Sequence, residues 1–249
     1  MKRILLFLSA LFITTTAIAH TINWYVDGNV YHTTTCESGD NVTPPTAPEK
    51  YGYTFKGWKS YAPIEYLEST GTQWIDTGLI FDQDTSIKIK VNLNDVTVNQ
   101  YGYVFGAGDS AQTNSFEMYT WDSAIDFNYN GNNSSEKISS GDTVVVDWDK
   151  NKIKYSKNEG PYVQITTSYV PFSTPYTVTM FAINRPNGIR GTSQIKIYYF
   201  KVYDKGYLIR DFIPVLDKDG TPCMFDLVEH KFYCNAGTGN FIAGPIIGE

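Results

Sequence analysis

The chain has 249 residues, of which 15% are aromatic and 18% charged, and its formal net charge is −6 at pH 7. This acidic balance argues against nucleic acid and anionic membranes as partners, because both are bound by basic surfaces. About 230 residues beyond an N-terminal leader suffice to bury a core, in one large domain or in a large and a small one. Aromatic residues favour strands, and no long segment repeats apolar residues at helical spacing, so we expect an all-β protein.

Residues 1–19 have the pattern of a secretory signal peptide. Lys2 and Arg3 precede an apolar stretch over residues 4–13, and Ala17-Ile18-Ala19 matches a small-x-small cleavage site. The apolar stretch is too short to span a bilayer, so we expect no membrane insertion after signal cleavage. The mature protein is therefore expected to be secreted or displayed at the cell surface, with the periplasm as an alternative.

Residues 20–59 have the pattern of a small β module. Residues 22–26 and 30–35 are strand-like, and Asp27-Gly28-Asn29 supplies a hairpin turn between them. A proline-rich connection follows, because prolines exclude a central strand. Residues 53–58 are expected to form a last short strand that carries aromatic side chains.

The segment PTAPEKYGYTFKGW resembles the signature of the Listeria–Bacteroides repeat, the internalin-type B repeat of bacterial surface proteins. The resemblance covers about residues 21–59 and implies a small β-grasp-like module. Such modules usually stand in tandem as spacers or contact surfaces, and one copy is found here. The motif positions are structural, so no catalytic residue is carried over. Residues 60–63 are then expected to link this module to a second one, residues 64–249.

The second part of the chain alternates between apolar and polar residues. In TSIKIKVNLN, positions 87, 89, 91 and 93 are apolar while Lys88 and Lys90 point the other way. Many short segments of this kind, separated by Gly, Asn, Asp and Pro, predict a sandwich or a barrel. In ESTGTQWIDTG we expect Trp74 to anchor the core from a strand bounded by Gly71 and Gly78.

Residues 64–244, with IEYLESTGTQWIDTG, YVFGAG and KIYYFKVYDKGYLIRDFIPVLDKDGTPCMFDLVEHKFY, resemble the concanavalin A-like lectin/glucanase sandwich, near its laminin G-like branch. The resemblance implies a jelly-roll β-sandwich. This fold hosts binding proteins and hydrolases alike, so the resemblance alone does not decide the function.

Cys223 and Cys234 flank the segment MFDLVEHKFY. If Val228-Glu229 forms the turn, the two cysteines face each other across antiparallel strands at a distance that a disulfide accepts. We therefore expect a disulfide, the alternative being two small buried apolar side chains. Cys36 is then the odd cysteine, either a buried thiol or a site of intermolecular pairing.

Catalytic motifs are not found. The hydrolases of this superfamily resemble one another in a Glu-x-Asp-x-x-Glu strand, which places three carboxylates on one face. No glutamate of this chain has aspartate two residues later, and Asp147 and Asp149 are expected to solvate a strand end. The metalloprotease, serine-hydrolase and phosphate-loop motifs are absent as well. We therefore expect no enzyme.

The segment FEMYTWDSAIDFNYNGNN has the composition of a sugar-binding site. Pyranose C–H faces pack on aromatic rings, and the hydroxyl groups need directional polar partners. The candidate ligand-binding residues are Tyr119, Trp121, Asp122, Asn128 and Tyr129. The alternative for each ring is a place in the core.

Two further segments offer candidate contacts. NRPNGIRG adds Arg185 and Arg190 on a loop tip suited to an acidic or sulfated ligand, the alternative being a solubilising hairpin tip. DKDG, with Asp217 and Asp219, is similar to the start of a calcium loop, but the distal bidentate glutamate is missing and an Asp-Gly hairpin turn explains it. No cofactor is expected, and calcium is the one ion left open.

These patterns predict a secreted bacterial surface protein with a non-catalytic binding role and a glycan or a surface protein as partner. Carbohydrate adhesion is the first hypothesis. A structural or protein-interaction component of a cell-envelope assembly is the alternative, and a glycoside hydrolase is the least favoured one.

Overall fold

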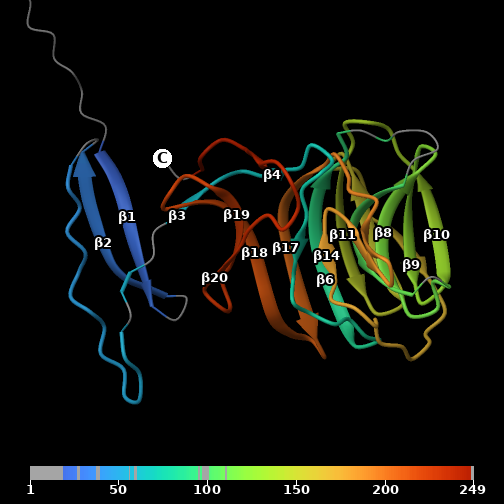
Figure 1. Cartoon of the computed structure of the whole chain (residues 1–249), viewed down its shortest axis with the longest axis horizontal. Helices are drawn as coiled ribbons and strands as arrows, with labels where there is room; N and C mark the ends of the chain where they lie inside the picture. Colours follow the sequence, from blue (N-terminus) through green and yellow to red (C-terminus); the bar gives the residue numbers. More distant parts are fainter. Residues whose placement is uncertain are drawn as a thin grey trace, which may run out of the picture. The chain divides into compact units, whose positions relative to one another are not determined.

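The computed structural model describes residues 19–26, 29–37, 40–55, 57–58, 61–94, 96, 101–109 and 111–247. This part of the chain is all-β, and no helix in it is long and apolar enough to cross a membrane. The chain forms two compact units, one up to Trp58 and one over Lys59–Gly248 (Figure 1). Except for Ala19, the expected signal peptide lies outside the described residues.

The first unit contains one hairpin, made of β1 (Ala19–Val26) and β2 (Asn29–Glu37). Its expected turn at Asp27 and Gly28 lies outside the described residues. Cys36 lies on β2, half-buried, at the register position opposite His20.

The last short strand expected at residues 53–58 is wrong for the described residues of that segment. Positive φ angles at Gly52 and Gly57 interrupt the extended backbone, and side-chain contacts hold the segment instead. The Trp58 indole N–H donates to the Pro45 carbonyl at 3.2 Å, and its ring lies 5.1 Å from that of Trp24. The β-grasp-like sheet is therefore not found in the described part of this unit.

The second unit is a two-layer antiparallel sandwich of the jelly-roll type, as expected (Figure 1). We name its layers the β8 sheet and the β17 sheet. In spatial order the β8 sheet contains β10 (Asn132–Lys137), β9 (Ala124–Tyr129), β8 (Phe116–Trp121), β7 (Gly102–Ala107), β14 (Thr179–Met180) and β5 (Ile75–Asp76). A small hairpin of β15 (Ile183–Arg185) and β16 (Gly188–Arg190) lies beside β7.

The β17 sheet forms the other layer. In spatial order it contains β13 (Val163–Thr166), β12 (Lys152–Lys157), β11 (Thr143–Asp149), β6 (Thr85–Asn92), β17 (Lys196–Asp204), β18 (Tyr207–Asp217), β19 (Pro222–Asp226) and β20 (Lys231–Tyr233). Three short strands complete it, β3 (Tyr61–Pro63) on β18, β4 (Leu67–Glu68) on β17 and β21 (Ile242–Ala243) on β4.

The linker expected at residues 60–63 is wrong from Tyr61 onward, because β3 belongs to the sandwich. Pro63 is opposite Val215 in the ladder, and the next residue, Ile64, is 1% exposed. Its backbone N–H donates to the Pro214 carbonyl at 3.0 Å. Burial of Ile64 and this ladder bring the segment into the second unit.

The core lies between the two sheets. On β6, Ile87, Ile89 and Val91 are fully buried, as the alternation predicts. Trp148 is also fully buried, and its ring lies 4.4 Å from that of Phe116 on the opposite sheet. These large side chains hold the layers together and fix which face of each sheet points outward.

Trp74 is not the core anchor that the sequence suggested. Its neighbours Gln73 and Ile75 are buried at 1% and 0% exposure, so alternation turns Trp74 away from the core. Its ring is half-buried against Gly237, where an added Cβ would lie 2.8 Å from Cδ1 of the indole. Trp148 is the tryptophan found between the sheets.

Cys223 and Cys234 form a disulfide, with a Cα–Cα distance of 4.5 Å. Phe225 lies opposite Phe232 in the adjoining ladder, the register that the sequence suggested. Val215, Cys223 and Phe225 form a small buried cluster separate from the main core. The disulfide therefore links the two sides of the β19–β20 hairpin beside this smaller apolar cluster.

Candidate functional site

Strand β8 carries aromatic side chains on the outside of its sheet. Phe116 and Met118 point into the main core, so Tyr119 and Trp121 point away from it, and Tyr119 packs in a separate cluster with Tyr103. This arrangement gives the β8 sheet an outer surface of rings, on the side opposite the core.

Four rings form this surface, which we call the ring face: Tyr101, Tyr103, Tyr119 and Trp121. Tyr101 stacks on Trp121 with 4.2 Å between centroids and 21° between planes. The Tyr103 and Tyr119 rings are 5.2 Å apart and only 7% and 6% exposed, whereas Tyr101 is 45% exposed. Tyr101 is therefore the tyrosine of the ring face that is open to a ligand, Tyr103 and Tyr119 are buried, and Trp121 is partly buried.

A hollow of about 410 Å³ adjoins the ring face. Its lining residues are Tyr101, Tyr103, Ile183, Arg185, Asn187, Arg190 and Gly191. Gly191 has a φ of +57°, and an added Cβ would lie 2.4 Å from Cδ2 of Tyr103. Because only glycine permits that approach, the end of β16 lies directly on the Tyr103 ring and forms one wall of this ring-face hollow.

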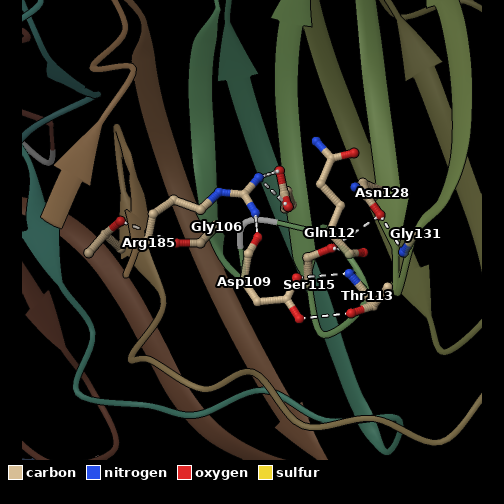
Figure 2. Close-up of polar contacts among 10 residues, drawn as sticks. Gly106, Asp109, Gln112, Thr113, Ser115, Asn128, Gly131 and Arg185 are labelled. Carbon is tan, nitrogen blue, oxygen red and sulfur yellow. Dashed lines mark hydrogen bonds and ion pairs between the residues drawn. The ribbon is translucent and has the colours of Figure 1, made fainter. Parts of the chain in front are cut away.

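Arg185 lies across β7 and reaches Glu117 on β8. Its Nη2 is 2.8 Å from Oε1 and 3.0 Å from Oε2 of Glu117, and its Nη1 donates to the Asp109 carbonyl. The Arg185 side chain is 11% exposed and that of Glu117 is 0% exposed. Figure 2 shows Arg185 extending past Gly106 towards Asp109, whose carboxylate in turn accepts hydrogen bonds from Thr113.

The glycines of the YVFGAG segment make room for this ion pair. An added Cβ at Gly108 would lie 2.4 Å from the Ser115 Cβ and 3.3 Å from Nη1 of Arg185. At Gly106 it would lie 3.2 Å from the Glu117 Cβ. A side chain at Gly108 would crowd Ser115 and the guanidinium, so glycine is required there for packing, whereas at Gly106 it would press on Glu117.

Burial shifts the pKa values of Glu117 and of the two buried ring-face phenols. It raises the pKa of Glu117 to about 7, although the charge of Arg185 opposes the rise. Burial likewise raises the pKa of the Tyr103 and Tyr119 phenols above their usual range. The phenols are therefore neutral at physiological pH and present hydroxyl groups.

Two polar residues of β9 lie beside the rings. Asp126 is the cross-strand partner of Tyr119 and is half-buried, and burial raises the pKa of its carboxyl group against a hydrogen bond from Ser135. Asn128 is fully buried, and its Oδ1 accepts from Ser115 Oγ at 3.3 Å and from the Gly131 N–H at 2.8 Å (Figure 2). Asn128 therefore shapes the β9–β10 turn, and Asp126 is a partly exposed carboxylate opposite Tyr119.

The structure brings together four of the seven residues that the sequence selected as ligand contacts. Tyr119, Trp121, Arg185 and Arg190 meet at the ring face and its hollow. Asn128 is near them but buried.

The other two selected residues are corrected. Tyr129 is fully buried in the main core, because it shares the inward parity of Phe127, and its hydroxyl donates to the Gln83 carbonyl at 3.3 Å. Asp122 lies in the tight turn between β8 and β9 with a φ of 47°, and its side chain is exposed away from the lining of the hollow.

Asp217 and Asp219 lie at a hairpin turn. The Asp217 carboxylate accepts the backbone N–H groups of Asp219 and Thr221 at 2.9 and 2.8 Å, and Asp219 pairs with Lys218. These hydrogen bonds lower the pKa of Asp217. Among the residues that the structure describes, no group of three or more His, Cys, Asp or Glu side chains is placed to hold a metal ion.

Sequence reasoning missed Tyr101, Tyr103, Glu117 and Asn187. The segment Tyr101-Gly102-Tyr103 alternates two aromatic side chains and could have indicated a ring on one face of a strand. A register shift between Tyr103 and Phe105 breaks this alternation, so the sequence alone does not show which face Tyr103 occupies. Val104 and Phe105 both enter the core, which leaves Tyr103 outside. A second hollow, of about 430 Å³, is lined by Asp147 and by four exposed residues, Lys154, Tyr162, Val163 and Gln164.

No protein-family model matches the chain, and no curated protein matches it. Similar solved structures include a NanB sialidase variant from Streptococcus pneumoniae, with 16% identity, a TM-score of 0.38 and coverage of 59% of this chain and 27% of that chain. Domains LG4-5 of the mouse laminin alpha1 chain show 10% identity, a TM-score of 0.38 and coverage of 79% and 53%. A glycoside hydrolase family protein from Mycobacterium thermorestibile shows 14% identity, a TM-score of 0.30 and coverage of 50% and 65%. The chain spans less than two thirds of each of these proteins, and the similarities carry no argument about function.

Proposed function

We propose that this chain is a secreted or surface-displayed module that binds carbohydrate on the ring face without converting it chemically. The observation that carries the proposal is the 45% exposed Tyr101, stacked on Trp121 at the edge of a hollow that is also lined by Asn187 and Arg190. An aromatic ring whose orientation is fixed by stacking offers a preorganised platform for the C–H face of a pyranose. Such a platform beside polar groups is the arrangement that sugar binding requires.

The polar groups around Tyr101 suit hydroxyl recognition. Asn187 offers an amide donor and acceptor, Arg190 offers guanidinium donors, and both line the hollow with exposed side chains. Asp126 contributes a carboxylate acceptor next to Tyr119. The set mixes donors and acceptors, which a sugar needs because each hydroxyl both donates and accepts.

The state of the carboxylates supports a non-catalytic role. Glycoside hydrolysis takes two carboxyl groups that flank the scissile bond. Glu117 has no exposed surface and both of its oxygens face Arg185, so it has no access to a glycosidic oxygen. Among the described lining residues of the hollow there is no carboxylate. The proposed function also needs no cofactor, and the Asp217 carboxylate is occupied by backbone amides.

A protein-contact role for the first unit is the second candidate. Tyr31, Tyr51 and Tyr53 are 45%, 103% and 72% exposed, so this unit presents several aromatic rings to solvent. With the repeat-like sequence of this unit, these rings favour a contact surface for another protein of a cell envelope. The two roles are compatible, since they use different units.

Glycan binding can be tested with an array of bacterial, plant and animal glycans, followed by calorimetry on the best ligand. Tyr101→Ala and Trp121→Ala should each lower affinity at least tenfold, as expected when about 1.4 kcal/mol of ring contact is lost. Tyr162→Ala, at the second hollow, removes an exposed ring that precedes β13 of the other sheet and should leave affinity unchanged. A correctly folded protein that binds no glycan, or whose binding survives both ring-face substitutions, would refute the proposal. Turnover of a bound glycan would refute its non-catalytic part.

A further inference from the structure

We infer that the sugar held at the ring-face hollow carries a carboxylate, and that Arg190 binds this group. The inference rests on the proposed function and names the class of its ligand. It makes Arg190 the residue that separates acidic from neutral glycans.

The charge of the hollow is the first observation. Two arginines and one asparagine are among its lining residues, and no carboxylate is. The chain as a whole carries six more acidic than basic groups, so a hollow whose charged lining residues are two arginines, one of them already paired with Glu117, differs from its average surface. A local cationic hollow on an acidic protein indicates an anionic ligand group.

The two arginines differ in what they already bind. Arg185 is neutralised by Glu117 and has bonded both of its terminal nitrogens, so it forms a fixed wall of the hollow. Arg190 is exposed, and in the part of the chain that the structure describes it makes no ion pair and no side-chain hydrogen bond. The guanidinium available to a ligand is therefore that of Arg190.

The backbone holds Arg190 at the side of the aromatic platform. Arg190 is opposite Ile183 in the β15–β16 ladder, and the next residue, Gly191, lies against the Tyr103 ring. In a hexuronic acid the carboxylate is attached at the edge of the pyranose ring. A uronic acid whose face lies on Tyr101 therefore directs its carboxylate sideways, where an arginine beside the platform can reach it.

The chemistry of the single available guanidinium selects among anions. Arginine presents a planar fork that matches a carboxylate through two parallel hydrogen bonds. The adjoining ring requires an apolar face next to that anion, which a pyranose has and an acidic peptide side chain lacks. A carboxylated sugar satisfies both groups at once.

The test uses the full chain on an array in which each carboxylated glycan is printed beside the same glycan with its carboxyl group reduced to an alcohol. Sulfated glycans and polyglutamate of matched charge are printed as further probes. Wild type should bind carboxylated glycans at least about tenfold more tightly than their reduced partners, the scale of a charge-assisted hydrogen bond. Arg190→Gln should remove this preference and leave binding of the reduced partners unchanged.

Two further variants sharpen the test. Arg190→Lys keeps the charge but loses the fork, so it should retain only part of the preference. Lys154→Gln removes one positive charge from the exposed side of the β17 sheet and should change nothing. Thermal unfolding checks that each variant is folded.

The possible failures are distinguishable. Equal binding of carboxylated and reduced glycans overturns this inference and leaves the proposed function standing. A preference for sulfated glycans, or binding of polyglutamate as tight as that of the carboxylated glycans, also overturns it. If folded wild type binds no glycan, the proposed function fails and the inference fails with it. A carboxylate preference that survives in Arg190→Gln removes Arg190 from the account.

Discussion

Arg185 on β15 binds both carboxylate oxygens of Glu117 on β8, at 2.8 and 3.0 Å, although 68 residues separate them in the sequence. The pair is nearly closed to solvent, with side-chain exposures of 11% and 0%. Because the β15–β16 hairpin also carries Arg190 and is followed directly by Gly191, this ion pair fixes one wall of the ring-face hollow. The pair is thus a structural support for the ligand site.

The first prediction concerns the coupling between these two residues. At about pH 8, above the raised pKa of Glu117, Glu117→Ala and Arg185→Ala should each lower the free energy of unfolding by about 3–5 kcal/mol, because each leaves a buried charge without its partner. The double variant should lose much less than the sum of the two, since neither charge then remains. Urea unfolding followed by tryptophan fluorescence measures all four proteins. Additive losses would mean that the pair is not coupled.

The second prediction concerns the two glycines under Arg185. Gly108→Ala should destabilise the protein by about 1–3 kcal/mol through overpacking, because its Cβ would lie 2.4 Å from the Ser115 Cβ. Gly106→Ala is the matched comparison and should cost less, since its nearest contact is 3.2 Å. Thermal unfolding ranks the two variants. A reversed order would contradict the packing assigned to this segment.

The third prediction concerns pH. Burial raises the pKa of Glu117 from 4.5 to about 7, so between these values the folded state binds a proton that the unfolded state has lost. The free energy of unfolding should therefore fall as pH rises from about 4.5 to 7. Glu117→Gln does not titrate, so its stability should lack this part of the decline. Unfolding curves at several pH values measure the difference, and parallel profiles for the two proteins would count against the raised pKa.

The alternation of apolar and polar residues predicted the sandwich and the buried residues of β6, because each strand has one face on the core. It also placed Tyr119 and Trp121 on a common face, and this parity is retained in the structure. It could not decide which face of a strand points outward, so Tyr129 entered the candidate site although it lies in the core. The hollow itself needs a bulge at Tyr103 and an ion pair between distant strands, and neither has a local signature in the sequence.

The fourth prediction concerns the disulfide. Replacing Cys223 and Cys234 together by serine should lower the free energy of unfolding by about 2–4 kcal/mol. The bridge reduces the conformational entropy of the unfolded chain, and the variant loses this restriction. A reductant should destabilise wild type by a similar amount and leave the serine variant unaffected. Chemical unfolding with and without reductant makes the comparison. An equal effect of reductant on both proteins would exclude this bridge as its target.

The fifth prediction tests the ring face by the indole N–H signals in a ¹⁵N–¹H spectrum. The chain has five tryptophans, and Trp121 is the one on the ring face, whereas Trp148 is fully buried with its N–H bonded to the Lys150 carbonyl. Assignment follows from single replacements of tryptophan by phenylalanine.

Titrating the best glycan from the array into labelled protein is the most direct measurement. If carbohydrate binds at the ring face, the Trp121 signal shifts in a saturable way while the Trp148 signal stays in place. Saturable shifts confined to Trp24 and Trp58 of the first unit, or a Trp121 signal that stays unchanged at saturation, would contradict the account.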